Sequence, residues 1–269
     1  MKKKRYFRWE KQSAATVLYP VLFGILLLVL WQTQLLHKML GADTFALPLP
    51  GRILRIILDN GPAILKNVKA TVLVATGGLL CGSVFGYLLG IVATVFPKWG
   101  AGGLSIASAV SAVPIIAIAP ILNNLTKDFS DDANVRSMLA KTLVVTITCT
   151  VSMSINAYRG LNELKPFSLD LMNSYAAGKK TVFLKLRIPN SVPYIFVALR
   201  VSVPASIISA LVSEYFAEFI IGVGRQIREN IVLAQYATAW AYIVVACAIG
   251  IIMYGFLLLA EGILLKGRK

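Results

Sequence analysis

Charged residues are scarce in this chain, and acidic residues are the scarcest. Only 14% of the 269 residues are charged while 57% are hydrophobic, and Lys and Arg outnumber Asp and Glu by 27 to 12. Soluble globular domains carry about 25% charged residues, so this composition argues against a soluble domain. The composition alone therefore indicates a membrane protein.

Residues that commonly bind metals or carry out catalysis are also few. The sequence has one histidine and three cysteines, and the cysteines lie within apolar runs with no CxxC spacing. We interpret them as small buried hydrophobic residues and not as disulfide partners or metal ligands. The sequence contains no GxxxxGK[ST] motif, no HExxH motif and no recognisable Ser/His/Asp arrangement. We expect no cofactor, no metal, no catalytic residue and no ATP binding through a Walker motif.

Long hydrophobic runs are what the sequence has in abundance. A bilayer core of about 30 Å needs about 20 helical residues to cross it. The first run is too long for the core of a typical signal peptide, so we interpret it as a span. We predict an all-α membrane protein with a single transmembrane domain over residues 14–265 and spanning helices at residues 14–36, 64–96, 101–122, 136–158, 189–216 and 239–265.

The segments that flank these six runs alternate along the chain between those with more and those with fewer basic residues. Segments 1–13, 97–100, 159–188 and 266–269 hold most of the loop lysines and arginines. Because Lys and Arg collect in cytoplasmic loops, we predict that both termini are cytoplasmic. This topology accounts for the net charge of +15 without nucleic acid as a partner, and membrane lipid is the expected environment.

The second predicted span contains glycines at a regular spacing. Gly78, Gly82, Gly86 and Gly90 recur every four residues, which places them on one face of a helix. A face without side chains lets a neighbouring helix approach closely. We predict that these glycines pack against a neighbouring helix.

Two other spans contain residues that are unusual at membrane depth. Pro114 and Pro120 interrupt backbone hydrogen bonding in the third span and either line a wet cavity or merely kink a packing helix. In the fifth span, Arg200 should need a paired acid or a wet environment. Glu214 and Glu218 lie near the outer end of that span. A structural or gating role and simple solvation by the headgroup region are both open for these two acids.

The loop between the fourth and fifth spans carries a short helical pattern. Ser168 is the expected N-cap, Phe167 precedes it as part of a hydrophobic staple, and Gly178 suits the left-handed residue that ends a helix. Asp170 falls in the first turn, where the helix dipole favours a carboxylate. A compact helix exposed between two spans is suited to binding another protein.

This segment resembles the cytoplasmic coupling loop of bacterial ABC-importer permeases, whose consensus is roughly Glu-Ala-Ala, three residues, Gly, and about a dozen residues later a hydrophobic residue and Pro. Aligned from Pro189, Asp170 takes the Glu position and Ala176 takes the Gly position. The resemblance implies an ATPase-docking surface formed by Asp170, Leu171, Met172, Tyr175, Ala176, Lys179 and Phe183.

Three further stretches resemble segments of these permeases, the first of them in the sulfonate, taurine and nitrate branch. They are LPLPG at Leu47–Gly51, which in that branch precedes an external surface helix, AVPIIAIAP at Ala112–Pro120, and GVGRQI at Gly222–Ile227. For the residues after LPLPG, an ordinary connecting loop is an equally good interpretation. The predicted external loop 123–135 is longer and more acidic than in the branch.

The resemblance implies a type I importer permease with six spanning helices and a cytoplasmic coupling helix, located in the bacterial inner membrane. Its expected partners are separate ABC ATPase subunits, an extracytoplasmic solute-binding protein and a second permease subunit, with a homodimer expected. The expected substrate is a small solute of the sulfonate, nitrate or vitamin and pyrimidine-precursor type. The chain itself is expected to be a transport subunit and not an enzyme.

A different class of function also fits the hydrophobic runs. A secondary transporter or channel-like protein that works without an ATPase would explain the spans and the proline-containing third run. It would not explain a capped helix within a basic loop. An intramembrane enzyme is a weaker alternative, because no convergent set of catalytic residues is present.

Overall fold

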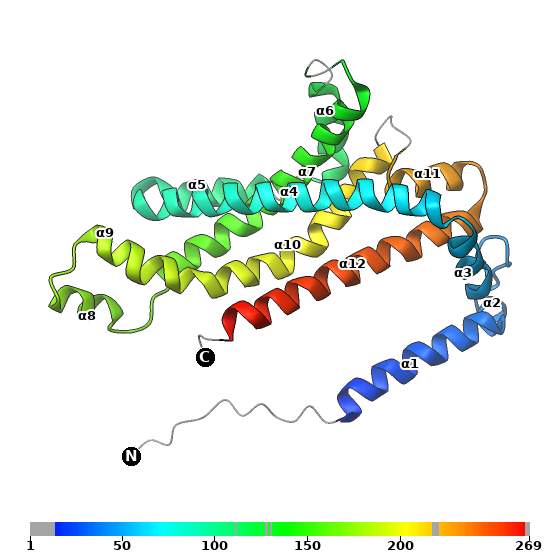
Figure 1. Cartoon of the computed structure of the whole chain (residues 1–269), viewed down its shortest axis with the longest axis horizontal. Coiled ribbons are helices and arrows are strands. Elements are labelled where there is room, and N and C mark those ends of the chain that lie inside the picture. The colour runs from blue at the N-terminus through cyan, green and yellow to red at the C-terminus, as the bar shows by residue number, and fades with distance from the viewer. Residues whose placement is uncertain (1–13, 111, 127–128, 130, 217–220, 267–269) are drawn as a thin grey trace.

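Four long helices form the body of the protein and lie side by side in Figure 1. A computed structural model describes residues 14–110, 112–126, 129, 131–216 and 221–266, and in these ranges all regular structure is helical. By length and apolar composition four helices can cross a membrane. They are α4 (Gly61–Val95), α7 (Ala133–Asn162), α10 (Ile188–Phe216) and α12 (Tyr236–Leu265).

The short helices are divided between the two ends of this body. The end near α8 (Ser168–Ser174) and α9 (Lys179–Val182) also receives the C-terminal end of α12. The opposite end holds α2 (Leu35–Leu40), α3 (Pro50–Asp59) and α11 (Val223–Val232). This separation agrees with the alternation of basic segments in the sequence.

The helices α4 and α7 pack closely along the glycine face predicted from the sequence. All four glycines are buried. A Cβ on Gly82 would lie 2.6 Å from a carbonyl oxygen of α7, and a Cβ on Gly86 would lie 2.5 Å from another. A Cβ on Gly90 would lie 2.7 Å from the Cβ of Ala157. Each of these separations is shorter than real Cβ contacts, so only glycine allows this approach.

The first apolar run is shorter as a helix than predicted. The helix α1 (Ala14–Gln32) ends before residue 36, and α2 begins after a break. The break occurs because Gln34 adopts the left-handed conformation, with φ of 62°. The side chains of residues 18–29 of α1 are exposed, and α1 contacts mainly α2 and α3.

The predicted third span, residues 101–122, is two helices and not one. Helix α5 is Pro97–Val110 and α6 is Ile115–Leu125, and Figure 1 shows α6 standing away from α5. Pro114 causes the break, because it adopts an extended conformation with ψ of 129° and a proline disfavours helix in the residue before it. Pro120 lies within α6, which packs against α7 and α10.

The residues after LPLPG form helix α3, so the connecting-loop interpretation was wrong. Pro50 is at the first position of the helix, where its missing N–H costs no hydrogen bond. Ile53 is buried, and α3 packs against α12. A surface location in the membrane interface stays a prediction.

The helix that contains the fifth predicted span begins ten residues earlier than that span. A π-helical turn, η1 (Phe183–Arg187), joins α9 to α10, and residues Lys179–Phe216 form one continuous helix of 38 residues. A helix commonly ends before a proline, because proline lacks the N–H that the next turn requires. Here the wider π turn ends at Arg187, two residues before Pro189, and the chain stays helical through the proline.

Candidate functional site

The short helix α8 lies at the place where the sequence predicted a coupling helix, but it begins differently. Phe167 is the N-cap residue, in a left-handed conformation with φ of 64° and without a capping side-chain bond. Ser168 is already the first helical residue, so the predicted Ser168 cap was wrong. The Phe167 side chain is 81% exposed, which leaves no hydrophobic staple.

The C-terminal end of α8 has a Schellman motif. The Ala176 N–H donates to the Asn173 carbonyl at 2.9 Å, and the Ala177 N–H donates to the Met172 carbonyl at 3.0 Å. Ala176 takes the left-handed position with φ of 50°. Gly178, predicted for that role, instead precedes α9 in an extended conformation. The family alignment had placed Ala176 at the Gly position, and it located this turn more accurately than the local pattern did.

The two faces of α8 have different surroundings. Leu171 and Tyr175, which lie one helical turn apart, are 59% and 77% exposed, and Phe167 continues the same face. We call these three residues the outer face. Leu169 and Asn173 lie on the opposite side and line a cavity between α8, the end of α4 and α9.

The predicted docking residues are therefore divided between two surfaces. Leu171 and Tyr175 belong to the outer face. Lys179 and Phe183 line the cavity instead. Asp170 is exposed in the first turn of α8, and Met172 is half-buried.

Three polar side chains fix the end of α7 to the start of α10. Arg187 donates to the Leu161 carbonyl at 2.9 Å and to Asn162 Oδ1 at 2.8 Å. Asn190 Nδ2 donates to the Gly160 carbonyl at 2.8 Å. Tyr194 donates its hydroxyl to Glu163 Oε2 at 3.1 Å. The sequence analysis did not identify these residues, whose only signal was their position at the start of an apolar span.

At the opposite end of α10, the Glu214 side chain is fully buried. Its carboxyl group accepts the Thr71 hydroxyl at 2.8 Å and the Gly224 N–H at 2.8 Å. The Thr71 oxygen in turn accepts the Val223 N–H at 2.9 Å. We call Glu214, Thr71 and residues 222–224 the Glu214 clasp, because they hold α4, α10 and α11 together.

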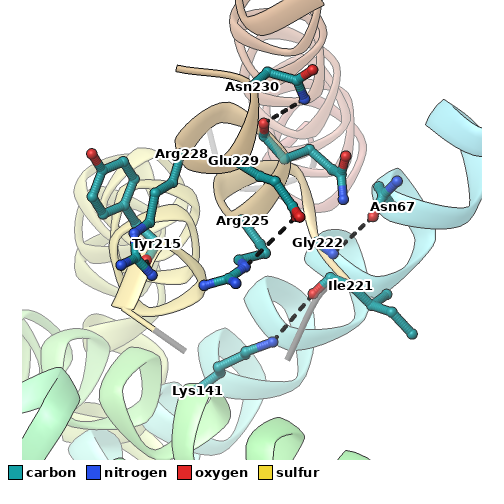
Figure 2. A network of polar contacts seen from close by, with 10 residues as sticks. Asn67, Lys141, Tyr215, Ile221, Gly222, Arg225, Arg228, Glu229 and Asn230 are labelled. Carbon is teal, nitrogen blue, oxygen red and sulfur yellow. Dashed lines mark hydrogen bonds and ion pairs between the residues drawn. The ribbon is translucent and has the colours of Figure 1, made fainter. Parts of the chain in front are cut away.

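The clasp requires glycine at residue 222. Gly222 has φ of 131°, and a Cβ there would lie 2.7 Å from either oxygen of the Glu214 carboxyl group. Its N–H donates to Asn67 Oδ1 at 2.9 Å, as Figure 2 shows. The GVG stretch noticed in the sequence is thus the segment that closes over Glu214.

A buried cation from α7 extends this network. Lys141 is only 4% exposed, and its Nζ donates to the Ile221 carbonyl at 3.3 Å (Figure 2). Arg225 and Glu229 form a longer ion pair at 3.9 Å. Sequence reasoning assigned no role to Lys141, although an ionisable residue within a span is a signal by itself. Glu218 lies outside the described residues.

Arg200 has the acidic partner that the sequence analysis required. Its Nε donates to Glu261 Oε2 at 2.9 Å, and a second guanidinium nitrogen lies 2.6 Å from Glu261 Oε1. This two-point geometry joins α10 to α12. Glu261 was not identified beforehand, although it is the one acid in the sequence of the sixth predicted span.

Comparison with known proteins agrees with this arrangement. The profile of the family described as "Binding-protein-dependent transport system inner membrane component" matches residues 82–262. The chain is 26% identical over 253 residues to the formylaminopyrimidine transport permease protein ThiX of Halalkalibacterium halodurans, covering 94% of this chain and 96% of the relative. It is also 26% identical over 199 residues to a probable ABC transporter permease protein of Haemophilus influenzae, covering 74% and 77% of the two chains.

The family match includes α8, Glu214 and residues 222–224 of the clasp, and it covers most of the helical body described above. Permeases of this kind are the membrane components of ABC transporters that also use ATPase and solute-binding subunits. The chain belongs to the family of inner-membrane components of binding-protein-dependent transport systems.

Proposed function

We propose that this chain forms the translocation pathway of an ABC importer and that α8 is its coupling helix. The observation that carries the proposal is the outer face of α8, where three large apolar side chains are exposed on a short helix. Exposed apolar patches on aqueous segments mark binding sites for other proteins. An ATPase subunit that covers this face would exclude water from it.

The attachment of α8 supports a coupling role. Arg187 and Asn190 follow α8 in the chain, and both donate hydrogen bonds to the end of α7, which precedes α8. A displacement of α8 is therefore transmitted to two long helices and is not absorbed by a slack loop. Movement of rigid elements about an interface is one established form of two-state switching.

The Glu214 clasp supports the other half of the mechanism. The helix α10 runs from the coupling segment to the clasp, so it connects the two ends of the protein (Figure 1). We propose that α8 faces the cytoplasm, that both termini lie on that side of the bacterial inner membrane, and that the clasp lies near the external side. In this orientation the clasp would hold or gate the external end of the pathway.

The substrate and the remaining partners are part of the proposal. The relative from Halalkalibacterium halodurans is named for formylaminopyrimidine transport, which supports a small solute of the pyrimidine-precursor, sulfonate or nitrate type. A solute-binding protein would deliver it, and a second copy of the chain would complete the pathway. The family match favours this importer over an ATPase-independent transporter.

The test is co-purification with the cognate ATPase. Leu171→Ser with Tyr175→Ser removes the apolar part of the outer face, and we expect at least a tenfold loss of bound ATPase. Val232→Ser with Leu233→Ser is the matched control, because both residues are exposed apolar residues at the other end of the protein. Equal ATPase binding by the two variants would refute the docking assignment.

A further inference from the structure

Behind α8 lies a cavity that the proposed ATPase contact does not use. It has a volume of about 660 Å³ and opens between α8, the C-terminal end of α4 and the α9–η1 segment. Cavities of about 300–1,000 Å³ are large enough for small ligands. Because Leu169 and Asn173 face the cavity while Leu171 and Tyr175 face outward, an ATPase on the outer face would leave the cavity accessible.

The cavity is basic on one side. Lys179, Lys180 and Arg187 all line it, and its lining contains no acidic residue. In the part of the chain that the structure describes, none of the three forms a salt bridge with an acidic side chain. Such a cluster favours an anionic ligand.

The cavity also has an apolar wall. Val95 from the end of α4 and Leu184 from η1 line it, and these side chains are 54% and 51% exposed. An inorganic anion would leave this wall in contact with water. A ligand with both a negative charge and hydrocarbon would cover both surfaces.

The position of the cavity along the helices agrees with such a ligand. The continuous helix Lys179–Phe216 has 38 residues and is about 57 Å long at about 1.5 Å per residue, compared with about 30 Å for a bilayer core. In the orientation proposed above, its first turns would extend beyond the hydrocarbon on the side of α8. The cavity would then lie at that boundary, where lipid headgroups are found.

We propose that this cavity binds the headgroup of an anionic phospholipid, with the phosphate near Lys179 and Lys180 and the upper acyl carbons against Val95 and Leu184. Basic pockets on the cytoplasmic side of membrane proteins bind such headgroups. The proposal rests on the orientation given under the proposed function. A bound lipid would support the inner face of α8 and so hold the coupling helix away from the bundle.

The test measures lipid binding to the purified full-length chain without an ATPase. Native mass spectrometry and thermal melting compare phosphatidylglycerol with phosphatidylcholine of the same acyl chains. Inorganic phosphate and deacylated glycerophosphoglycerol distinguish a lipid from a free anion. The variant is Lys179→Gln with Lys180→Gln. The control is Lys165→Gln with Lys185→Gln, which removes the same charge from the same loop but outside the cavity lining.

We expect phosphatidylglycerol to bind the wild-type chain and the control alike, and the cavity variant about 10- to 30-fold more weakly. Equal weakening of both variants would show a general charge effect and overturn the site. Equal binding of phosphatidylcholine, or displacement of the lipid by phosphate or the deacylated headgroup, would also overturn it. These comparisons on the wild-type chain decide the matter even if a variant misfolds. Failure here alongside normal ATPase co-purification would leave the proposed function intact.

Discussion

The surroundings of the two ends of α10 differ in whether their key side chains find partners within the chain. At the Glu214 end, a buried carboxyl group has its hydrogen-bond donors supplied by α4 and α11. At the α8 end, the large apolar side chains of Phe167, Leu171 and Tyr175 are exposed. The Glu214 carboxyl group has its partners within the chain, whereas the outer face of α8 is suited to being covered by another molecule. Substitutions at the first should therefore alter stability, and substitutions at the second should alter association.

Glu214→Ala should have the largest effect on stability. The substitution leaves the Gly224 N–H without an acceptor in a buried site, at about 1–3 kcal/mol, and leaves the Thr71 hydroxyl only its longer bond of 3.2 Å to the Asn67 carbonyl. We expect the melting temperature in detergent to fall by about 2–12 °C, taking about 2–4 °C per kcal/mol. Glu214→Gln keeps the shape and one acceptor oxygen, so it should lose less. If the Glu214→Ala protein melts at the wild-type temperature, the clasp does not stabilise the fold and the proposed difference between the two ends is wrong.

Arg187→Ala should have the next largest effect, on coupling more than on stability. It removes the two hydrogen bonds that join η1 to the end of α7, worth about 1–2 kcal/mol at a partly exposed site. We expect ATPase binding to persist while substrate transported per ATP hydrolysed falls in proteoliposomes. Lys185→Ala is the control in the same turn. If both variants transport with the wild-type ratio, these bonds do not transmit motion.

Ala176→Gly should stabilise the turn after α8. Alanine at φ of 50° is strained by about 1 kcal/mol, and glycine is not. Glycine also raises the conformational entropy of the unfolded chain, which lowers the free energy of unfolding by about 0.4–1 kcal/mol. The net increase in the free energy of unfolding should therefore be a few tenths of a kcal/mol. Slower hydrogen exchange of the Ala177 amide would report it. Ala177→Gly, at the next position, should instead speed exchange. Faster exchange in Ala176→Gly would contradict the left-handed assignment.

The smallest stability effect is expected for Leu171→Ser with Tyr175→Ser. Exposed substitutions are usually within about 0.5 kcal/mol of neutral, so the melting temperature of the isolated permease should be unchanged. The same variant should lose ATPase binding, as proposed above. A large loss of stability would show that this face packs within the protein and would remove the difference between the two ends.

The long helices could be predicted from the sequence because their signal is local. Apolar length located α4, α7 and α12, and the four-residue glycine spacing identified the face of α4 that meets α7. The break at Pro114 was less predictable, since a proline within an apolar run is compatible with both a kink and a complete interruption. The π turn before Pro189 has no clear sequence signal.

The candidate sites were predictable only where one residue type carried the information. Arg200 and Glu214 were noticeable because charges are rare in spans. Their partners Glu261 and Thr71 come from distant parts of the chain, and no local pattern connects them. Gly224 is only ten residues from Glu214, but nothing in the sequence pairs the two. The coupling residues are divided because Leu171 lies on α8 whereas Lys179 and Phe183 lie on α9 and η1, and spacing alone did not fix how these short helices are placed.

The glycine face has a consequence for how the protein can move. Carbonyl oxygens of α7 occupy the space that side chains of α4 would otherwise fill, so sliding by one residue would force Cβ atoms into backbone. Close-packed interfaces of this kind are stiff. The pair α4–α7 should therefore move as one rigid body throughout a transport cycle. The relative displacements that open and close a passage must then occur where this pair meets other helices.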